Sequence, residues 1–391
     1  MGRRHLRGYA ALERAGLLPA RLVAVADADP LRAGQAARIF ESEAGRPPLV
    51  FTGLEAVVAD DRVEAVDLVV PTRHHHELAK VALSAGRHVL VEKPLGITIR
   101  ACREMAEVAA LHGRTLAVAE NYRRVPTHRA LKAAIDAGLV GQPYAVSVHT
   151  VQQTTPGESG AGGWFRDRWL VGSLPMLELA VHEADLLRHL FGEVEEVYGR
   201  VATYEAGPEA GGTAGFLSED AGAALLRFAN GALGQLLVLT AGHGGGSGGR
   251  LISGRLGRIE SRRWEGWEDG VVSLDGRPPV QSSRWVSDWL AALPATDRDR
   301  LLPRGTWDES NLQVDIHDPL RYGIATELHD FAEAVSIGRP PEVGADDGTR
   351  AVAICLAILE SALENRPVAV EDVLSGRLDR WQASLDRPRP G

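Results

Sequence analysis

The sequence predicts an α/β protein of two domains. The first is expected to hold a parallel sheet covered by helices, and the second is expected to be an α+β domain with a large, mostly antiparallel open sheet. The length of 391 residues exceeds the size at which one hydrophobic core usually stops growing. Short β-branched runs alternate with helical patterns in the first third, and longer strand-like runs follow residue 122. We therefore divide the chain into residues 1–121 and 122–391.

Five short apolar runs in the first domain are expected to be buried strands. They are residues 22–26, 49–51, 65–70, 88–92 and 116–120. Helical patterns precede and separate these runs, and several of the helical patterns end at a glycine. The helical patterns are residues 3–15, 30–44, 54–60, 74–85 and 98–112. This alternation is the order of a Rossmann-like doubly wound sheet, whose strand ends hold a dinucleotide.

The beginning of the chain lacks one part of this pattern. A doubly wound sheet starts with a buried strand that runs into a glycine-rich turn, whereas this chain starts at the helix, with Gly2 in the place of the third glycine. We expect about a dozen residues upstream that supply the strand and the glycines, with loss of the strand as the alternative. Gly244, Gly246 and Gly249 also match G-x-G-x-x-G, but a strand-like run follows them, so we expect a flexible loop there.

The second domain is expected to contain four further strands and two long helices. The strands are residues 145–151, 194–203, 222–229 and 234–240, and helical periodicity covers 324–365 with a break at 339–341. Residues 264–320 are rich in tryptophan, charge and proline without a clear period, so we treat them as an insertion of unknown role.

Composition excludes several classes of protein. The net charge of −9 argues against sequence-independent nucleic-acid binding. No stretch of about 18 apolar residues could span a membrane, and no signal peptide is recognisable, so we expect a cytoplasmic protein. Cys102 and Cys355 lie in apolar helical patterns without metal-ligand spacing and are expected to be structural thiols. The histidine run 74–76 points its side chains in different directions, so we expect no metal site.

Lysine is rare in this chain, and one lysine has a special position. Lys93 follows the apolar run 88–92 at the carboxyl end of the predicted sheet, where ligands bind in open α/β folds. Of 43 basic residues only three are lysines, the others being Lys80 and Lys132 on helical patterns. Lysine can release its proton and arginine cannot, so Lys93 is a candidate for chemistry.

A helical segment of the second domain carries three ionisable groups on one face. Glu178, His182 and Asp185 follow the spacing i, i+4 and i+7, while leucines supply the packing. Burying three such groups is costly unless they are paired or face a cavity. We therefore expect this face to line a site.

Several blocks in the same order resemble the glucose-fructose oxidoreductase and inositol dehydrogenase family, called Gfo/Idh/MocA. The blocks are Pro71-Thr72 with His75, the run 85–95 that contains Glu92-Lys93-Pro94, Glu120-Asn121-Tyr122-Arg123, His182-Glu183-Ala184-Asp185, and Leu328-His329-Asp330-Phe331 with 338–341. The family usually has aspartate where Glu178 stands, and glutamate keeps the carboxylate but adds a methylene group.

The resemblance implies an NAD(P)-dependent dehydrogenase that acts on a hydroxyl or carbonyl carbon of a sugar, cyclitol or related polyol. His182 is then the acid–base group, Lys93 stabilises the alkoxide, and Glu178 orients the histidine. Asp27 ends the first predicted strand, where a carboxylate accepts hydrogen bonds from the ribose of NAD and repels the 2′-phosphate of NADP. We therefore expect NAD as the cofactor, with NADP as the alternative. A non-catalytic ligand-binding or regulatory protein on the same scaffold is the alternative.

The remaining site residues expected from the resemblance form two groups. Cofactor contacts are expected from Gly2, Asp27, Pro71, Thr72, His75, Glu92, Lys93 and Asn121. Substrate contacts are expected from Tyr122, Arg123, Trp164, Arg166 and Asp185, with Arg168 beside them. We also expect a homo-oligomer that assembles through the C-terminal sheet.

Overall fold

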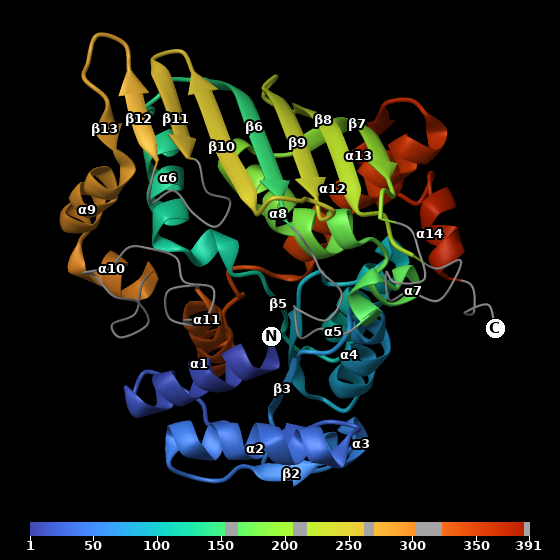
Figure 1. The fold of residues 1–391 in the computed structure, drawn as a ribbon. Helices are drawn as coiled ribbons and strands as arrows, with labels where there is room; N and C mark the ends of the chain where they lie inside the picture. Colours follow the sequence, from blue (N-terminus) through green and yellow to red (C-terminus); the bar gives the residue numbers. More distant parts are fainter. Residues whose placement is uncertain (153–162, 206–216, 262–269, 302–322, 387–391) are drawn as a thin grey trace.

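The structure is a computed structural model that describes residues 1–152, 163–205, 217–261, 270–301 and 323–386. Helices and short parallel strands of residues 1–121 lie at one end of the molecule, and a wide sheet lies at the other (Figure 1). No helix in these described ranges is long and apolar enough to cross a membrane.

The parallel strands of the first region match the predicted runs. They are β1 (Ala24–Ala26), β2 (Leu49–Phe51), β3 (Ala65–Leu68), β4 (His88–Glu92) and β5 (Leu116–Ala119). β1 pairs with β2, while β3, β4 and β5 form a separate three-stranded sheet. The extra strand expected upstream stays a prediction.

Helices connect these strands and cover them. They are α1 (Gly2–Arg14), α2 (Pro30–Ala44), α3 (Leu54–Val58), the short η1 (Thr72–His74), α4 (His75–Ser84) and α5 (Ile99–Leu111). The bounds of α2 follow from local chemistry: Asp29 accepts from the Leu31 N–H at the N-terminus, and Gly45 adopts a φ of 74° at the C-terminus.

In the described residues nine strands form the large sheet, in the order β13-β12-β11-β10-β6-β9-β8-β7-β14. Every pairing in it is antiparallel except that of β6 with β9. The strands are β6 (Pro143–Val151), β7 (Val194–Ala202), β8 (Ala221–Phe228), β9 (Leu233–Leu239), β10 (Ser247–Gly254), β11 (Gly257–Ser261), β12 (Val271–Leu274), β13 (Val280–Gln281) and β14 (Val368–Ala369).

The helices of the second region lie mainly on one face of this sheet (Figure 1). They are η2 (Tyr122–Arg124), α6 (Pro126–Asp136), η3 (Gly163–Arg166), α7 (Arg168–Val171), η4 (Leu174–Leu179), α8 (Ala180–Phe191), α9 (Ser282–Ala292), α10 (Ala295–Leu301), α11 (Ile324–Ile337), α12 (Ala345–Glu364), α13 (Val370–Leu374) and α14 (Arg380–Leu385). α12 approaches β7 so closely that a Cβ at Gly199 would collide with the Ile358 carbonyl. Burial alternates along β8 and β9, so their other face is exposed.

The C-terminal segments return to the first region. The Gln382 side-chain oxygen accepts the Ile99 N–H at the start of α5, although the two residues are 283 positions apart. The Val118 N–H in β5 donates to the Val343 carbonyl at 3.0 Å. Figure 1 also shows α11 beside α1. The end of the chain therefore helps to hold the parallel strands.

The structure differs from one expectation for the second region and adds detail to another. Residues 242–246, which include Gly244 and Gly246, lie outside the strands as expected, but β10 begins at Ser247, so Gly249 lies in a strand and is buried. Within 264–320, the described residues form β12 and β13, which extend the sheet, and α9, whose Val286 and Leu290 pack on Ala130. The break at 339–341 between two helices is confirmed.

Candidate active site

The carboxyl ends of three parallel strands meet the second region at one place. Thr72 follows β3, Lys93 follows β4 and Glu120 follows β5. η4 and α8 bring Glu178 and His182 to the same place, where Glu178 contacts Lys93 and His182 contacts Glu120. The position agrees with the rule that open α/β sheets bind ligands at their carboxyl edge.

Lys93 is held by the segment before α8. Its Nζ donates to the Glu178 carbonyl at 2.6 Å and lies 3.7 Å from the Glu178 Oε2. Only 12% of the Lys93 side chain and 5% of the Glu178 side chain are exposed. The ammonium group is therefore fixed beside a buried carboxyl group, with one of its protons engaged by a backbone oxygen.

Glu178 has different partners from the one that the sequence suggests. The Thr72 hydroxyl donates to its carboxyl group, and no contact in the described part of the chain joins that group to the His182 ring nitrogens. η4 is a π-helical turn, which holds more residues per turn than an α-helix, so the i, i+4 spacing does not stack the two side chains. Burial raises the pKa of Glu178, although Lys93 and the bond from Thr72 oppose this.

His182 is oriented by Glu120. Its Nδ1 lies 2.8 Å from both carboxylate oxygens of Glu120, and both residues are buried. The Tyr122 ring stacks on the imidazole, and the Tyr122 N–H donates to the Glu120 Oε1 at 2.9 Å. The expectation that Glu178 orients His182 is therefore wrong for this structure, in which the carboxylate of Glu120 faces the ring instead.

Arg123 and Asp185, both expected to bind substrate, bind each other. Arg123 donates from Nε to Oδ2 at 2.6 Å and from Nη2 to Oδ1 at 2.5 Å, and both side chains are buried. The Arg123 Nη2 also lies 3.2 Å from the Asp347 Oδ1 in α12. This pair connects η2 to α8 and α12, and its fork geometry leaves fewer hydrogen-bonding positions for a ligand.

Glu92 belongs to a buried cluster beneath Lys93. His5 of α1 contacts the Glu92 Oε1 through Nε2 at 3.1 Å and the Asp67 Oδ2 through Nδ1 at 2.8 Å. Burial opposes the charge of His5, but Asp67 and Glu92 raise its pKa well above the ordinary value. Burial likewise opposes ionisation of Glu92, but His5 and Lys93 lower its pKa to about 2. No sequence pattern points to His5, since its partners are distant in the chain.

His75 and Asn121 lie at the same strand ends, whereas Asp27 follows β1 in the separate two-stranded sheet. His75 is fully buried between two carbonyl oxygens, those of Pro94 at 2.9 Å and Val70 at 3.0 Å, and burial lowers its pKa. It therefore ties the turn after β3, which contains Pro71, to the segment after Lys93. Asn121 is buried directly after β5 and Glu120. Asp27 follows β1 and accepts the Asp29 N–H at 2.9 Å.

The aromatic and arginine residues expected to contact a sugar have other protein groups as partners. Trp164 packs edge-on against Phe165, with ring centroids 4.7 Å apart. The Arg166 Nη1 donates to the Glu205 carbonyl at 3.2 Å. Arg168 turns away to α14, where its guanidinium lies 3.8 Å from the centroid of Trp381. Arg168 therefore joins α7 to the C-terminal helix.

The strand ends suit a nicotinamide dinucleotide. Asp27 offers carboxylate oxygens for ribose hydroxyls, and the first turn of α1 offers backbone N–H groups for phosphates. The donor set therefore fits the group, with Lys93 and His182 beside it.

In the ranges that the structure describes, no group of three or more histidine, cysteine, aspartate or glutamate side chains could hold a metal ion. His76 is taken up by Glu104, with Nε2 and Oε2 2.8 Å apart. Cys102 and Cys355 are buried and unbonded to each other, and burial raises the pKa of the Cys102 thiol to about 12.

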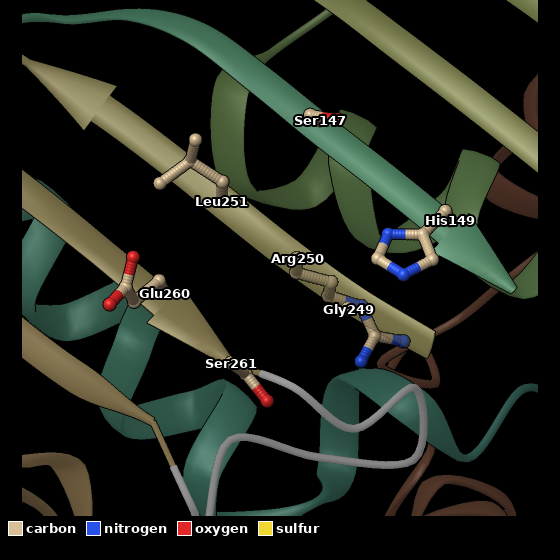
Figure 2. A pocket seen from close by; sticks show the side chains of 7 residues that line it. All are labelled: Ser147, His149, Gly249, Arg250, Leu251, Glu260 and Ser261. Atoms are coloured by element: carbon tan, nitrogen blue, oxygen red, sulfur yellow. The ribbon is translucent and has the colours of Figure 1, made fainter. Parts of the chain in front are cut away.

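A separate hollow lies on the outer face of the large sheet. Its lining comes from β6, β10 and β11 and includes Ser147, His149, Leu251 and Glu260 (Figure 2). Arg250 borders it but pairs with the buried carboxylate of Glu183 in α8. Lys93 and His182 do not line this hollow.

Two family models together match most of the chain. The model described as an oxidoreductase family with an NAD-binding Rossmann fold matches residues 1–120, and the GFO/IDH/MocA C-terminal domain matches residues 128–261. Both matched ranges include elements that build the site.

Individual relatives are dehydrogenases. The chain is 29% identical to a levoglucosan dehydrogenase of Pseudarthrobacter phenanthrenivorans over 62% of its own length and 66% of that protein, slightly less than two thirds of the relative. It is 31% identical to inositol 2-dehydrogenase 2 of Saccharopolyspora erythraea, over 70% of this chain and 77% of that one. The solved structure of a levoglucosan dehydrogenase in complex with NADH and levoglucosan has a TM-score of 0.77 and 25% identity, and covers 95% of this chain and 96% of its own.

Proposed function

The chain belongs to the Gfo/Idh/MocA family of NAD-binding oxidoreductases, and from this premise we propose that it transfers a hydride between nicotinamide and a carbinol or carbonyl carbon of a sugar, cyclitol or related polyol. The observation that carries the proposal is the convergence of Lys93 and His182 at the carboxyl ends of β4 and β5. The cofactor, when bound, supplies the hydride acceptor or donor.

His182 is the proposed acid–base group. Since its Nδ1 is engaged by Glu120, its Nε2 is the atom that takes the proton of the substrate hydroxyl during oxidation and returns it during reduction. A histidine suits this role because one ring nitrogen can accept a proton while the other donates a hydrogen bond.

Lys93 is the proposed partner of the substrate oxygen. One of its protons is held by the Glu178 carbonyl, which fixes the direction of the others. Donation from Nζ to the reacting oxygen would stabilise the negative charge that develops there as its proton leaves. Glu178 is proposed to hold Lys93 in place through both its carbonyl and its carboxyl group.

Ring-shaped polyols are the first substrates to examine. The relatives are named for levoglucosan and inositol, and polyols of this kind present adjacent hydroxyls on a rigid ring. We expect the protein to reduce NAD when a polyol of this class is added. The absorbance of the reduced nicotinamide measures this in single-turnover and steady-state mixtures. Purified protein that binds NADH yet oxidises no sugar, cyclitol or sugar acid would favour the non-catalytic alternative.

We also propose that the protein works in the cytoplasm as a homo-oligomer formed through the outer face of the large sheet. Support comes from the exposed fractions of three leucines on this face, 60% for Leu225, 62% for Leu233 and 36% for Leu251. Light scattering after size exclusion should give a multiple of the chain mass, and Leu225→Arg with Leu233→Arg should lower it. An unchanged monomeric mass in both samples would contradict the assembly.

A further inference from the structure

We propose that Glu120 is the positioning residue of this site: its carboxylate keeps the imidazole proton of His182 on Nδ1 and so leaves Nε2 to exchange a proton with the substrate hydroxyl. The inference rests on the proposed function, because it assigns a role within that proton transfer. It concerns a carboxylate that directly follows β5, whereas His182 comes from α8.

The geometry of the pair is specific. Both Glu120 oxygens lie 2.8 Å from Nδ1, so the carboxylate is centred on this nitrogen. Glu120 is 2% exposed and His182 is 9% exposed, which leaves little water to replace the contact. A carboxylate accepts hydrogen bonds only, and the ring nitrogen that faces it must therefore carry the proton.

Glu120 is held in its ionised form. Burial alone would raise its pKa, but the charge of His182, the hydrogen bonds from His182 and the Tyr122 N–H, and the charge of Lys93 lower it below the ordinary value. An ionised carboxylate both orients the ring and stabilises the imidazolium that forms when Nε2 takes a proton.

The neighbouring groups do not compete for Nδ1. The charged or titratable groups around the His182–Glu120 pair are Tyr122 after β5, Lys93 after β4, Glu178 in η4 and Asp185 in α8. Glu178 is engaged by Thr72 and Lys93, and Asp185 by Arg123. The Tyr122 ring covers one face of the imidazole, which restricts rotation away from Glu120.

Replacing Glu120 with glutamine tests the charge and the proton position together. The side-chain oxygen of the Glu120→Gln variant would remain the acceptor of the Tyr122 N–H, which now donates to the Glu120 Oε1 at 2.9 Å. The amide NH₂ would then take the place of Oε2, 2.8 Å from Nδ1, and a donor there disfavours a proton on Nδ1 and favours the tautomer with the proton on Nε2. This tautomer cannot accept the hydroxyl proton, so the variant separates orientation from mere filling of space.

The first measurement is the pH profile of polyol oxidation. We expect Glu120→Gln to lower kcat about 10²-fold or more while leaving NADH affinity within about twofold. Because the imidazolium loses its carboxylate, we expect the acidic limb of kcat/KM to move to lower pH by about one unit. Glu120→Asp keeps the charge, so it should retain part of the rate. Its acidic limb of kcat/KM should stay at the pH of the wild type.

The second measurement does not need turnover. Nitrogen NMR shifts of histidine-labelled protein, assigned with His182→Gln, report which ring nitrogen carries the proton. We expect Nδ1–H in the wild type and in Glu120→Asp, and Nε2–H in Glu120→Gln. Glu360→Gln is the matched control, because Glu360 is also fully buried and accepts a backbone N–H, that of Trp381, at 2.8 Å.

The outcomes separate the two proposals. An Nε2–H tautomer in the wild type, or a Glu120→Gln variant with the wild-type rate, tautomer and acidic limb, would overturn the positioning role even if the enzyme oxidises polyols. Failure of every polyol as a substrate would overturn the proposed function, while the tautomer spectra would still decide what Glu120 does. An equal effect of Glu360→Gln on tautomer and rate would also overturn the specific role.

Discussion

The Tyr122 ring lies flat on the imidazole of His182, with ring centroids 4.1 Å apart and planes inclined by 8°. Tyr122 is buried, so its ring packs against His182 and is not a solvent-exposed surface on which a sugar could stack. We expect Tyr122→Leu to lower kcat about tenfold, because the imidazole gains freedom to turn, and Tyr122→Phe to lower it less because a ring remains. Stopped-flow kinetics compares the two, and equal losses would show that the stack is not what matters.

Lys93 and His182 should act as one unit. We expect Lys93→Ala and His182→Ala each to lower kcat about 10²-fold or more, with the double variant little worse than either, because both act on the same oxygen. The affinity of these variants for NADH, measured by titration, should change little. Lys80→Ala is the matched control, since Lys80 pairs with Glu104 on the surface side of α4. A double variant with the wild-type rate would remove this site from consideration.

Asp27 should set the choice between the two nicotinamide cofactors. We expect NADH to bind more tightly than NADPH, because the carboxylate after β1 would repel a 2′-phosphate. Asp27→Ala should narrow the difference, and fluorescence titration measures both affinities. Asp29→Ala is a useful comparison, because Asp29 caps α2 with its Oδ1 and is not expected to change the ratio of the two affinities. Tighter binding of NADPH by the wild type would contradict the assignment.

Loss of Arg123 should destabilise the protein more than loss of its partner Asp185. Arg123→Leu leaves Asp185 as a buried carboxylate without its cation, so we expect a loss of about 3–5 kcal/mol in the free energy of unfolding. Asp185→Leu should cost less, since Arg123 keeps Asp347 at 3.2 Å. The double variant should lose less than the sum of the two. Urea titrations give the values, and strict additivity would mean that the pair is not coupled.

The cluster of His5 and Glu92 should limit stability at both ends of the pH range. The pKa of His5 is raised above 6.5, so its contribution is complete below that pH and is lost as the pH rises through the raised value. The pKa of Glu92 is lowered from 4.5 to about 2, so its contribution is complete above 4.5 and is lost as the pH falls toward 2. Urea midpoints against pH should show both falls.

His5→Gln should remove the alkaline fall and weaken the acidic one, because both depend on the imidazolium between two carboxylates. His112→Gln, in the exposed turn after α5, is the control and should leave the profile unchanged. An alkaline fall of the same size in His5→Gln would assign it to another group.

Local chemistry made much of the fold predictable. Asp29, Pro30 and Gly45 define both ends of α2, and the apolar run 88–92 gives β4. The start of β10 differs from the expectation because glycines usually indicate loops. Gly249 lies there for a different reason, since a Cβ on it would come within 2.8 Å of the His149 Cε1 on the neighbouring strand.

The site could be predicted only where the sequence spacing follows the geometry. Lys93 was found because it follows a clear strand. The pairing of Glu120 with His182 spans 62 positions, and a periodic pattern relates only neighbours on one element. A signal did exist: Glu120 follows β5 as Lys93 follows β4, and adjacent parallel strands end at the same edge. The π-helical turn before α8, which no pattern predicts, turned Glu178 away.

The bond from Ile99 to Gln382 has a consequence for biosynthesis. During translation the first 121 residues leave the ribosome long before the segment that accepts the Ile99 N–H and the one that pairs with Val118. Contacts between such distant parts of a chain form slowly, because a long loop must close first. We therefore expect the nascent parallel strands to stay incompletely ordered, and available to chaperones, until α14 has emerged.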